Sequence, residues 1–243
     1  MNTLLIDSVE SPADWPEEQV LEDWFGPLLE SLADYRCGLS AVAASDPDCA
    51  VRALHADAVI LTGSPRDAHS MEPAILQLCI ALRLLTERDV PILGVCFGHQ
   101  ILARALGGTV GRNPCGWEVG NAQVTLTDAA SCAPIFAGLP PKLDVLQSHQ
   151  DAVLALPPAA IRLAGNAHTT NQAFQSRHGG RQFGVQFHPE FTPERLCRNW
   201  IERRELLRGT TGFDLDAALD QAQPTPAAAT ILQRFLDFAQ TNP

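Results

Sequence analysis

The stretch PILGVCFGHQILARALGG, residues 91–108, contains the transition that decides the fold. An apolar run, PILGV, ends at Cys96, and an amphipathic run, GHQILARALGG, follows it and stops at two glycines. The first run has the length and composition of a buried strand, and the second has apolar residues at helical spacing before a glycine stop. The stretch therefore predicts a strand, a tight turn that carries a cysteine, and a helix.

The same alternation of elements occurs upstream of this stretch. Apolar runs bounded by turn residues predict strands at residues 3–7, 38–44 and 58–63. Apolar residues at helical spacing predict helices at residues 17–34, kinked or split at Pro27, and at residues 72–89. This alternation indicates βαβ units, and hence an α/β fold with a doubly wound, mostly parallel sheet and helices on both faces.

The second half of the chain has a different pattern. Short strand candidates with little helix between them indicate hairpins or a mixed sheet edge, at residues 122–126, 143–148, 161–165 and 183–187. Helical patterns return at residues 194–209, after Thr192 and Pro193, and at residues 225–240, which begin with Thr225 and Pro226. We therefore expect one domain over residues 1–205 and a helical C-terminal extension over residues 206–243 packed on the same domain.

The composition limits the classes of partner. Lys and Arg total 17 and Asp and Glu total 28, and a net charge of −11 disfavours nucleic-acid binding. No apolar run is long enough to cross a bilayer, so we expect no membrane partner. The seven cysteines are odd in number and follow no export signal, which indicates reduced thiols in the cytoplasm. Neither cysteine nor histidine spacing suggests a metal site, and we expect no cofactor.

Cys96 occupies the position where an open parallel sheet binds its ligands, at the carboxyl end of a strand. Glycines at positions 94 and 98 allow a sharp turn and a close approach of the neighbouring elements. This is the arrangement of a nucleophile elbow with cysteine in place of serine. The N-terminus of the following helix would stabilise a thiolate, and the amide of Phe97 would face the same space. A buried structural cysteine is the alternative interpretation.

A proton carrier for this thiol is found in FGVQFHPE, residues 183–190. The β-rich run ends at His188, which would place the imidazole at the same sheet edge as Cys96. Pro189 fixes the local backbone, so that Glu190 can hold one imidazole nitrogen. A histidine with a purely structural role is the alternative, but two features at one sheet edge favour a Cys-His-Glu triad.

These motifs together resemble the class I glutamine amidotransferases. GVCFGHQILARALGG (residues 94–108) is similar to the nucleophile motif of that family, and GVQFHPE (residues 184–190) is similar to its His-Pro-Glu motif. LTGSP (residues 61–65) and LQSHQD (residues 146–151) extend the match, which covers about residues 3 to 195 in the family's order. The resemblance implies a flavodoxin-like fold, and the C-terminal tail is similar to stand-alone members related to the amidotransferase domain of GMP synthase.

The resemblance also implies roles for individual residues. Cys96 would attack the side-chain carbonyl of a γ-glutamyl group, His188 would move the proton, and Glu190 would orient His188. The oxyanion hole would be formed by backbone amides of Gly63 or Ser64 with Phe97, although family members often have two glycines where this chain has Gly63 and Ser64.

Four further residues fall where they could bind the substrate. The resemblance places Gln100, Ser148 and His149 where the family grips the two ends of glutamate. Trp117, with Glu118 beside it, could line the pocket and influence which amine is accepted. A polar loop and an edge strand with one packed aromatic ring are the alternatives for these positions.

Three functions follow from the resemblance. The chain has no Walker-type phosphate loop and no room for a synthetase domain, so any ammonia acceptor would be another protein. LTGSPRDAHSMEP, residues 61–73, resembles the corresponding loop of stand-alone γ-glutamyl peptidases, which favours a self-contained hydrolase of a small γ-glutamyl amide. The alternatives are a glutaminase subunit that delivers ammonia to a separate synthetase or ligase, and a non-catalytic binding module on the same fold. The sequence does not specify an oligomeric state.

Overall fold

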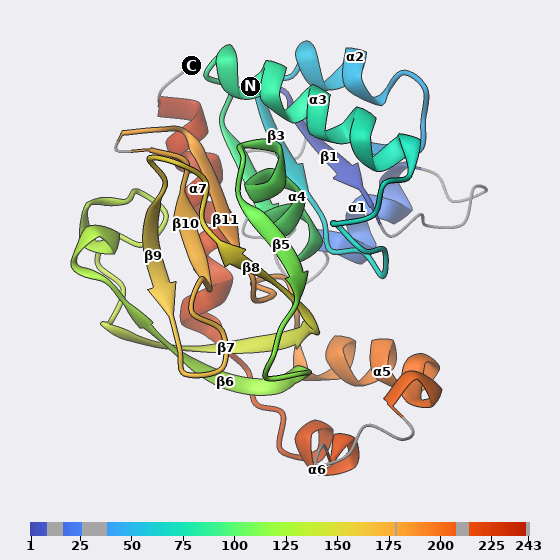
Figure 1. The fold of residues 1–243 in the computed structure, drawn as a ribbon, viewed down its shortest axis with the longest axis vertical. Helices are drawn as coiled ribbons and strands as arrows, with labels where there is room; N and C mark the ends of the chain where they lie inside the picture. The colour runs from blue at the N-terminus through green and yellow to red at the C-terminus, as the bar shows by residue number, and fades with distance from the viewer. Residues whose placement is uncertain (9–16, 26–37, 178, 208–213, 242–243) are drawn as a thin grey trace.

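One large sheet runs through the protein in the computed structural model, which describes residues 1–8, 17–25, 38–177, 179–207 and 214–241 (Figure 1). Within these residues its nine strands have the order β2-β1-β3-β4-β11-β10-β9-β6-β7. Their bounds are β1 Thr3–Asp7, β2 Leu39–Ala43, β3 Ala58–Leu61, β4 Ile92–Val95, β6 Glu118–Leu126, β7 Lys142–His149, β9 Ile161–Gly165, β10 Ala173–Gln175 and β11 Gln182–Val185. A separate antiparallel pair is formed by β5 (Thr109–Arg112) and β8 (Asp151–Ala155).

The large sheet is parallel in one half and antiparallel in the other. Strands β2, β1, β3, β4 and β11 pair in parallel, and the pairs from β11 onward are antiparallel. This confirms the predicted α/β fold and the mixed edge expected from the second half of the chain. Because β3, β4 and β11 run in the same direction, their carboxyl ends meet at one edge, where Gly63, Cys96 and His188 follow them.

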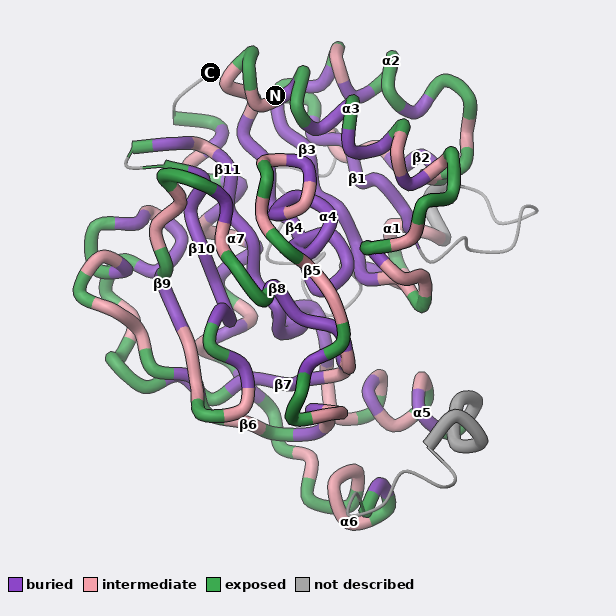
Figure 2. The backbone as a smooth tube through the Cα atoms, in the orientation of Figure 1, coloured by how far each residue is buried: buried purple, intermediate pink, exposed green. Residues whose placement is uncertain are grey.

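Helices cover both faces of the sheet, as predicted. One face packs against α1 (Glu17–Phe25) and α7 (Pro226–Thr241), and the other against α2 (Cys49–Leu54), α3 (Pro73–Glu87) and α4 (Phe97–Ala105). Successive strand residues alternate between the two cores, because side chains on a strand point to opposite faces. Leu5 lies in the core with α7, and its neighbours Leu4 and Ile6 lie in the core with α3 and α4. The buried positions follow these central strands (Figure 2).

The C-terminal helix α7 is part of the same core as the sheet. Its apolar face is buried through Ala228, Ile231, Leu232, Phe235, Leu236 and Ala239. Helices α5 (Pro193–Leu207) and α6 (Leu215–Asp220) instead form a third cluster with the end of β7, through Trp200, Leu215 and Leu146. Of the helix predicted at residues 17–34, only Glu17–Phe25 lies within the described residues. None of the helices described here is long and apolar enough to span a membrane.

Two glycines allow α4 to approach the sheet closely. A Cβ atom on Gly98 would lie 2.5 Å from the carbonyl oxygen of Leu61 in β3, and one on Gly94 would lie 2.4 Å from the carbonyl oxygen of Gly98. The helix therefore begins in direct backbone contact with two neighbouring strands. This contact fixes where the turn at Cys96 lies in the sheet.

Replacing Gly98 by alanine should destabilise the fold, because a methyl group there must push the helix away from β3. We expect Gly98→Ala to lower the free energy of unfolding by about 1–3 kcal/mol in urea titrations. Gly111→Ala in β5 is the control, because its nearest atom would be the movable end of the Leu154 side chain at 3.3 Å. Equal stability of the two variants would contradict this account of the close approach.

Candidate active site

Cys96 lies on a strained turn between β4 and α4, as the sequence predicts. Its backbone has φ 52° and ψ −101°, a combination that a residue other than glycine rarely adopts. The amide of Cys96 donates to the carbonyl of Val185 at 2.9 Å, and the amide of Gly98 donates to the carbonyl of Thr62 at 3.1 Å. These bonds hold the turn between two neighbouring strands, so the sulfur is fixed at their common edge.

His188 and Glu190 lie beside this turn and form a buried pair. Nδ1 of His188 lies 2.6 Å from Oε1 of Glu190, and the imidazole stacks on the ring of Phe191 with the centroids 4.0 Å apart. The amide of His188 donates to the carbonyl of Leu146. Nε2 of His188 is buried and has no hydrogen-bond partner among the described residues. One imidazole nitrogen is therefore held by a carboxylate, while the other is available for a proton transfer.

The charges around His188 favour its protonated form. Burial alone would lower the pKa of His188, but the negative charges of Glu190 and of a Cys96 thiolate outweigh it and raise the pKa to about 10. At neutral pH the imidazole is therefore a cation between a carboxylate and a sulfur. A cation in this position stabilises a thiolate, which is the nucleophilic form of cysteine.

The candidate oxyanion-hole residues lie against the same two side chains. A Cβ atom on Gly63 would lie 3.1 Å from Cε1 of His188 and 3.7 Å from Cβ of Cys96. The backbone amides of Gly63, Ser64 and Phe97 have no hydrogen-bond partner among the described residues. These amides therefore have the free donors that the stabilisation of an oxyanion needs.

Two hollows meet at Cys96, and Ser64 and Ser148 line both of them. The first hollow extends past His188 and Phe191 towards Trp24 and Arg195. The second hollow extends past Gln100 and Asp151 towards Arg112 and Trp117. A substrate whose scissile bond lies at the sulfur could therefore place one part in each hollow.

The four predicted substrate-binding residues all line the second hollow, but most of their polar atoms are already bonded. Nε2 of Gln100 donates to the carbonyl of Asp151 at 2.9 Å, and Oγ of Ser148 accepts from Nε1 of Trp200 at 3.0 Å. Trp117 packs edge-on against Trp200 with a centroid separation of 5.1 Å. These side chains therefore build and support the wall of the hollow.

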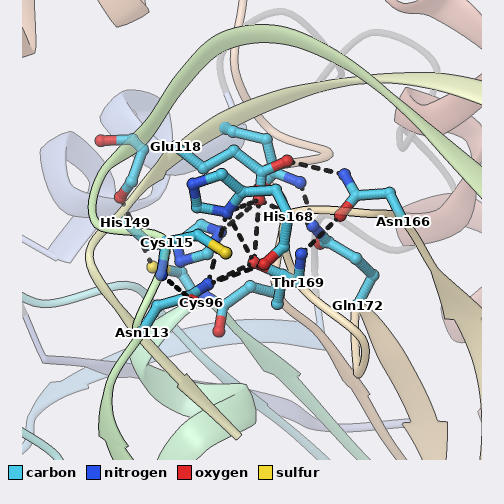
Figure 3. Close-up of polar contacts among 12 residues, drawn as sticks. Cys96, Asn113, Cys115, Glu118, His149, Asn166, His168, Thr169 and Gln172 are labelled. Carbon is cyan, nitrogen blue, oxygen red and sulfur yellow. Dashed lines mark hydrogen bonds and ion pairs between the residues drawn. The ribbon is translucent and has the colours of Figure 1, made fainter. Parts of the chain in front are cut away.

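His149 is the most enclosed member of this set. Its Nδ1 lies 2.9 Å from the carbonyl oxygen of Asp151, and its Nε2 lies 3.0 Å from Oε2 of Glu118 (Figure 3). Glu118 is the hub of a buried polar network, which also includes His168, a residue to which the sequence suggests no role. His149 therefore connects the wall of the second hollow to a carboxylate behind it.

A group of charged residues at the rim of the second hollow is not predicted by the sequence. Arg112 pairs with Asp67 at 3.5 Å and with Asp151 at 3.4 Å, and it also donates to the side chain of Gln150. His69 lies 3.2 Å from the other oxygen of Asp151. Asp67, His69 and Asp151 hold three potential metal-ligand atoms within 4.8 Å of one another, but the guanidinium of Arg112 already balances both carboxylates. The rim therefore offers both a cation and anions to a ligand.

The charge on His188 predicts a reactive thiol at Cys96. In Glu190→Gln the strongest of the charges that raise the pKa of His188 is lost, so this pKa should fall and the cationic form of the imidazole should be less favoured. We expect iodoacetamide to modify Cys96 much more slowly in this variant, with the rate read by peptide mass spectrometry. The exposed Cys115 and Cys132 serve as internal controls. An unchanged rate at Cys96 would contradict the role of the ion pair.

Comparisons with known proteins agree with this geometry. The family model for glutamine amidotransferase class-I matches residues 26–205. Gamma-glutamyl peptidase 5 of Arabidopsis thaliana is 36% identical over 172 residues, which are 69% of this chain and 68% of the relative. A glutamine-hydrolysing GMP synthase of Thermus thermophilus is 35% identical over 163 residues, 63% of this chain and 29% of the relative. The crystal structure of a glutamine amidotransferase from Thermotoga maritima has a TM-score of 0.74 at 21% identity, with 98% of this chain and 97% of that chain covered. The chain belongs to the class I glutamine amidotransferase family.

Proposed function

We propose that the protein hydrolyses a γ-glutamyl amide through a cysteine thioester and releases glutamate and an amine. The observation that carries this proposal is the arrangement of Cys96 on its strained turn with the 2.6 Å pair of His188 and Glu190 beside it. A cysteine, an imidazole and a carboxylate in these roles form the constellation for acyl transfer from an amide.

The reaction has two steps. The Cys96 thiolate attacks the γ-carbonyl carbon, and the amides near Gly63 and Phe97 bind the developing oxyanion. As the C–N bond breaks, the proton on Nε2 of His188 passes to the departing nitrogen, which leaves a glutamyl thioester on Cys96. Water then attacks the thioester, His188 accepts a proton from this water, and glutamate leaves as the thiolate re-forms. Glu190 keeps the imidazole oriented and stabilises its charge in both steps.

The two hollows suggest how the substrate is oriented. The rim of the second hollow carries Arg112 and Asp151, whose charges match the α-carboxylate and the α-ammonium of a γ-glutamyl group. The first hollow, towards Trp24 and Arg195, then receives the amine. In this orientation the γ-carbonyl carbon lies at Cys96, where the two hollows meet.

The names of the relatives support a hydrolase that acts alone. Gamma-glutamyl peptidases 5 and 3 of Arabidopsis thaliana each match about 69% of this chain and nearly the same share of their own length. The second candidate function is a glutaminase subunit for a separate synthetase, which is favoured by the match to about a quarter of several GMP synthases.

The six described cysteines are free thiols, which supports a reducing, cytoplasmic setting.

Glutamate release from a panel of γ-glutamyl amines, glutathione and glutamine tests the proposal. We expect Cys96→Ala to abolish turnover, His188→Asn to lower kcat/KM at least about a hundredfold, and Glu190→Gln to lower it less. Activity on glutamine that appears only with a partner protein would favour the subunit. Full activity of Cys96→Ala would refute the thioester route, and no glutamate release from any substrate would favour a non-catalytic module.

Arg112→Gln tests the orientation of the substrate. The loss of the guanidinium should raise KM for γ-glutamyl substrates about tenfold or more with little change in kcat, because the contact is present before and during the reaction. Arg177→Gln is a matched control, since Arg177 pairs with Asp89 and is as exposed as Arg112, at 57%. The same shift of KM in both variants would indicate a general effect of surface charge. A blocked α-carboxylate should make the wild type resemble Arg112→Gln.

A further inference from the structure

The carboxylate of Glu118 accepts four hydrogen bonds behind the wall of the second hollow. Oε1 accepts from Nδ2 of Asn166 at 2.6 Å, and Oε2 accepts from Oγ1 of Thr169 at 3.0 Å and from Nε2 of Gln172 at 2.9 Å. The bond from His149 is the fourth (Figure 3). Only 8% of Glu118 is exposed, so the network is shielded from solvent. Burial raises the pKa of Glu118, but the bonds and charges of its partners outweigh this effect, and the pKa is lowered.

The hydrogen bonds of His149 specify its protonation. Both ring nitrogens face atoms that only accept, namely the carbonyl oxygen of Asp151 and the carboxylate of Glu118. A neutral imidazole has only one N–H, so it would leave one of these acceptors facing a lone pair. Only the doubly protonated ring donates to both. The ring is 1% exposed, and the adjacent carboxylate supplies the charge that a buried imidazolium needs.

Other titratable groups also face this pair. Nδ1 of His168 lies 3.3 Å from Oε2 of Glu118, at the exposed side of the network. His99 in α4 is fully buried, and burial lowers its pKa to about 3, so it is neutral. The side chain of Asp151 is paired with His69 and Arg112 at the rim. Glu118 is therefore the carboxylate in direct contact with the His149 ring.

This ion pair is connected to the reacting sulfur by one residue. The carbonyl oxygen of Ser148, next to His149, lies 3.8 Å from Sγ of Cys96. Side chains hold the segment from Ser148 to Asp151 at several points. Trp200 bonds Ser148, Glu118 bonds His149, and Gln100 bonds the carbonyl of Asp151. Arg112 also donates to Gln150 and pairs with Asp151 at the rim, whereas the contact of His149 with Glu118 is the buried ring–carboxylate contact of the segment.

We infer that Glu118 is a positioning residue, whose buried carboxylate holds His149 as an imidazolium and thereby fixes the Ser148–Asp151 wall against Cys96. The effect on turnover rests on the proposed hydrolysis of γ-glutamyl amides, but the protonation of His149 does not. Displacement of this wall would move the second hollow relative to the sulfur, and small displacements of this kind cost catalysis heavily.

Two substitutions of Glu118 test the inference. Glu118→Gln keeps the size but turns an amide NH2 towards a cluster of donors, so we expect kcat/KM to fall about a hundredfold and His149 to lose one proton. Glu118→Asp keeps the charge on a shorter side chain, so it should retain the imidazolium and part of the activity. Histidine-selective 15N NMR reads the protonation of His149, with His149→Gln used to assign the signal.

A control variant separates positioning from stability. Gln182→Met removes a fully buried side chain that bonds Val90 and Ser176 at the far end of β11. It should lower the free energy of unfolding while leaving kcat/KM and the His149 signal unchanged. If Glu118→Gln behaves in the same way as this control, the inference is wrong. A wild-type His149 ring with a single proton would also overturn it.

An inactive wild type would count against the proposed function and not against this inference. The rate at which iodoacetamide alkylates Cys96 can be measured without a substrate, so it tests the positioning role independently of turnover. In Glu118→Gln the wall at Ser148 is no longer held against the sulfur, so iodoacetamide should reach Cys96 more easily and alkylation should be faster than in wild type. An unchanged alkylation rate together with an unchanged His149 signal would refute the positioning role.

Discussion

The close contact between the start of α4 and the neighbouring strands is the constraint on which the site depends. Gly98 lies against the backbone of β3, and the amide of Cys96 is bonded to β11, so the backbone of the turn between them is restricted to one conformation. This restriction forces Cys96 into a backbone conformation that costs about 1–3 kcal/mol. The strain persists because contacts with two strands and a helix fix the backbone of the turn. As a consequence, the sulfur lies at the carboxyl edge of the sheet beside the free amides.

His188 and His149 line the two hollows that meet at this sulfur, and their ring nitrogens are bonded differently. His188 has one nitrogen on Glu190 and one free, so its charge can change as a proton moves. Both nitrogens of His149 lie against acceptors, so the ring is held from two sides. Each ring has one carboxylate in contact, Glu190 for His188 and Glu118 for His149. The free nitrogen of His188 suits the proton transfer proposed for it, and the two bonded nitrogens of His149 suit the positioning inferred for the wall.

The sequence predicted the parts of the site that do not depend on strand register. Cys96 and His188 follow parallel strands, and the carboxyl ends of parallel strands meet at one edge whatever the detailed pairing. Glu118 and His149 meet because they are opposite each other in the β6–β7 ladder, and Arg112 and Asp151 meet in the same way in the β5–β8 ladder. These antiparallel registers are set by long-range pairing, so neither ion pair can be read from local patterns. The sequence feature that could have suggested these ion pairs is that Arg112 and Glu118 lie close together in a stretch with few helix-forming residues.

These two cross-strand pairs hold opposite ends of one short segment. β7 ends at His149 in the large sheet, and β8 begins at Asp151 in the small sheet, so the chain passes from one sheet to the other beside Cys96. Arg112 and Asp151 lie at the rim, where a zwitterionic substrate would exchange their mutual ion pair for pairs with its own carboxylate and ammonium. His149 lines the second hollow, and Glu118 lies behind it with only 8% exposed. If the substrate is oriented as proposed, the pair of Glu118 and His149 holds the wall while the pair at the rim is exchanged.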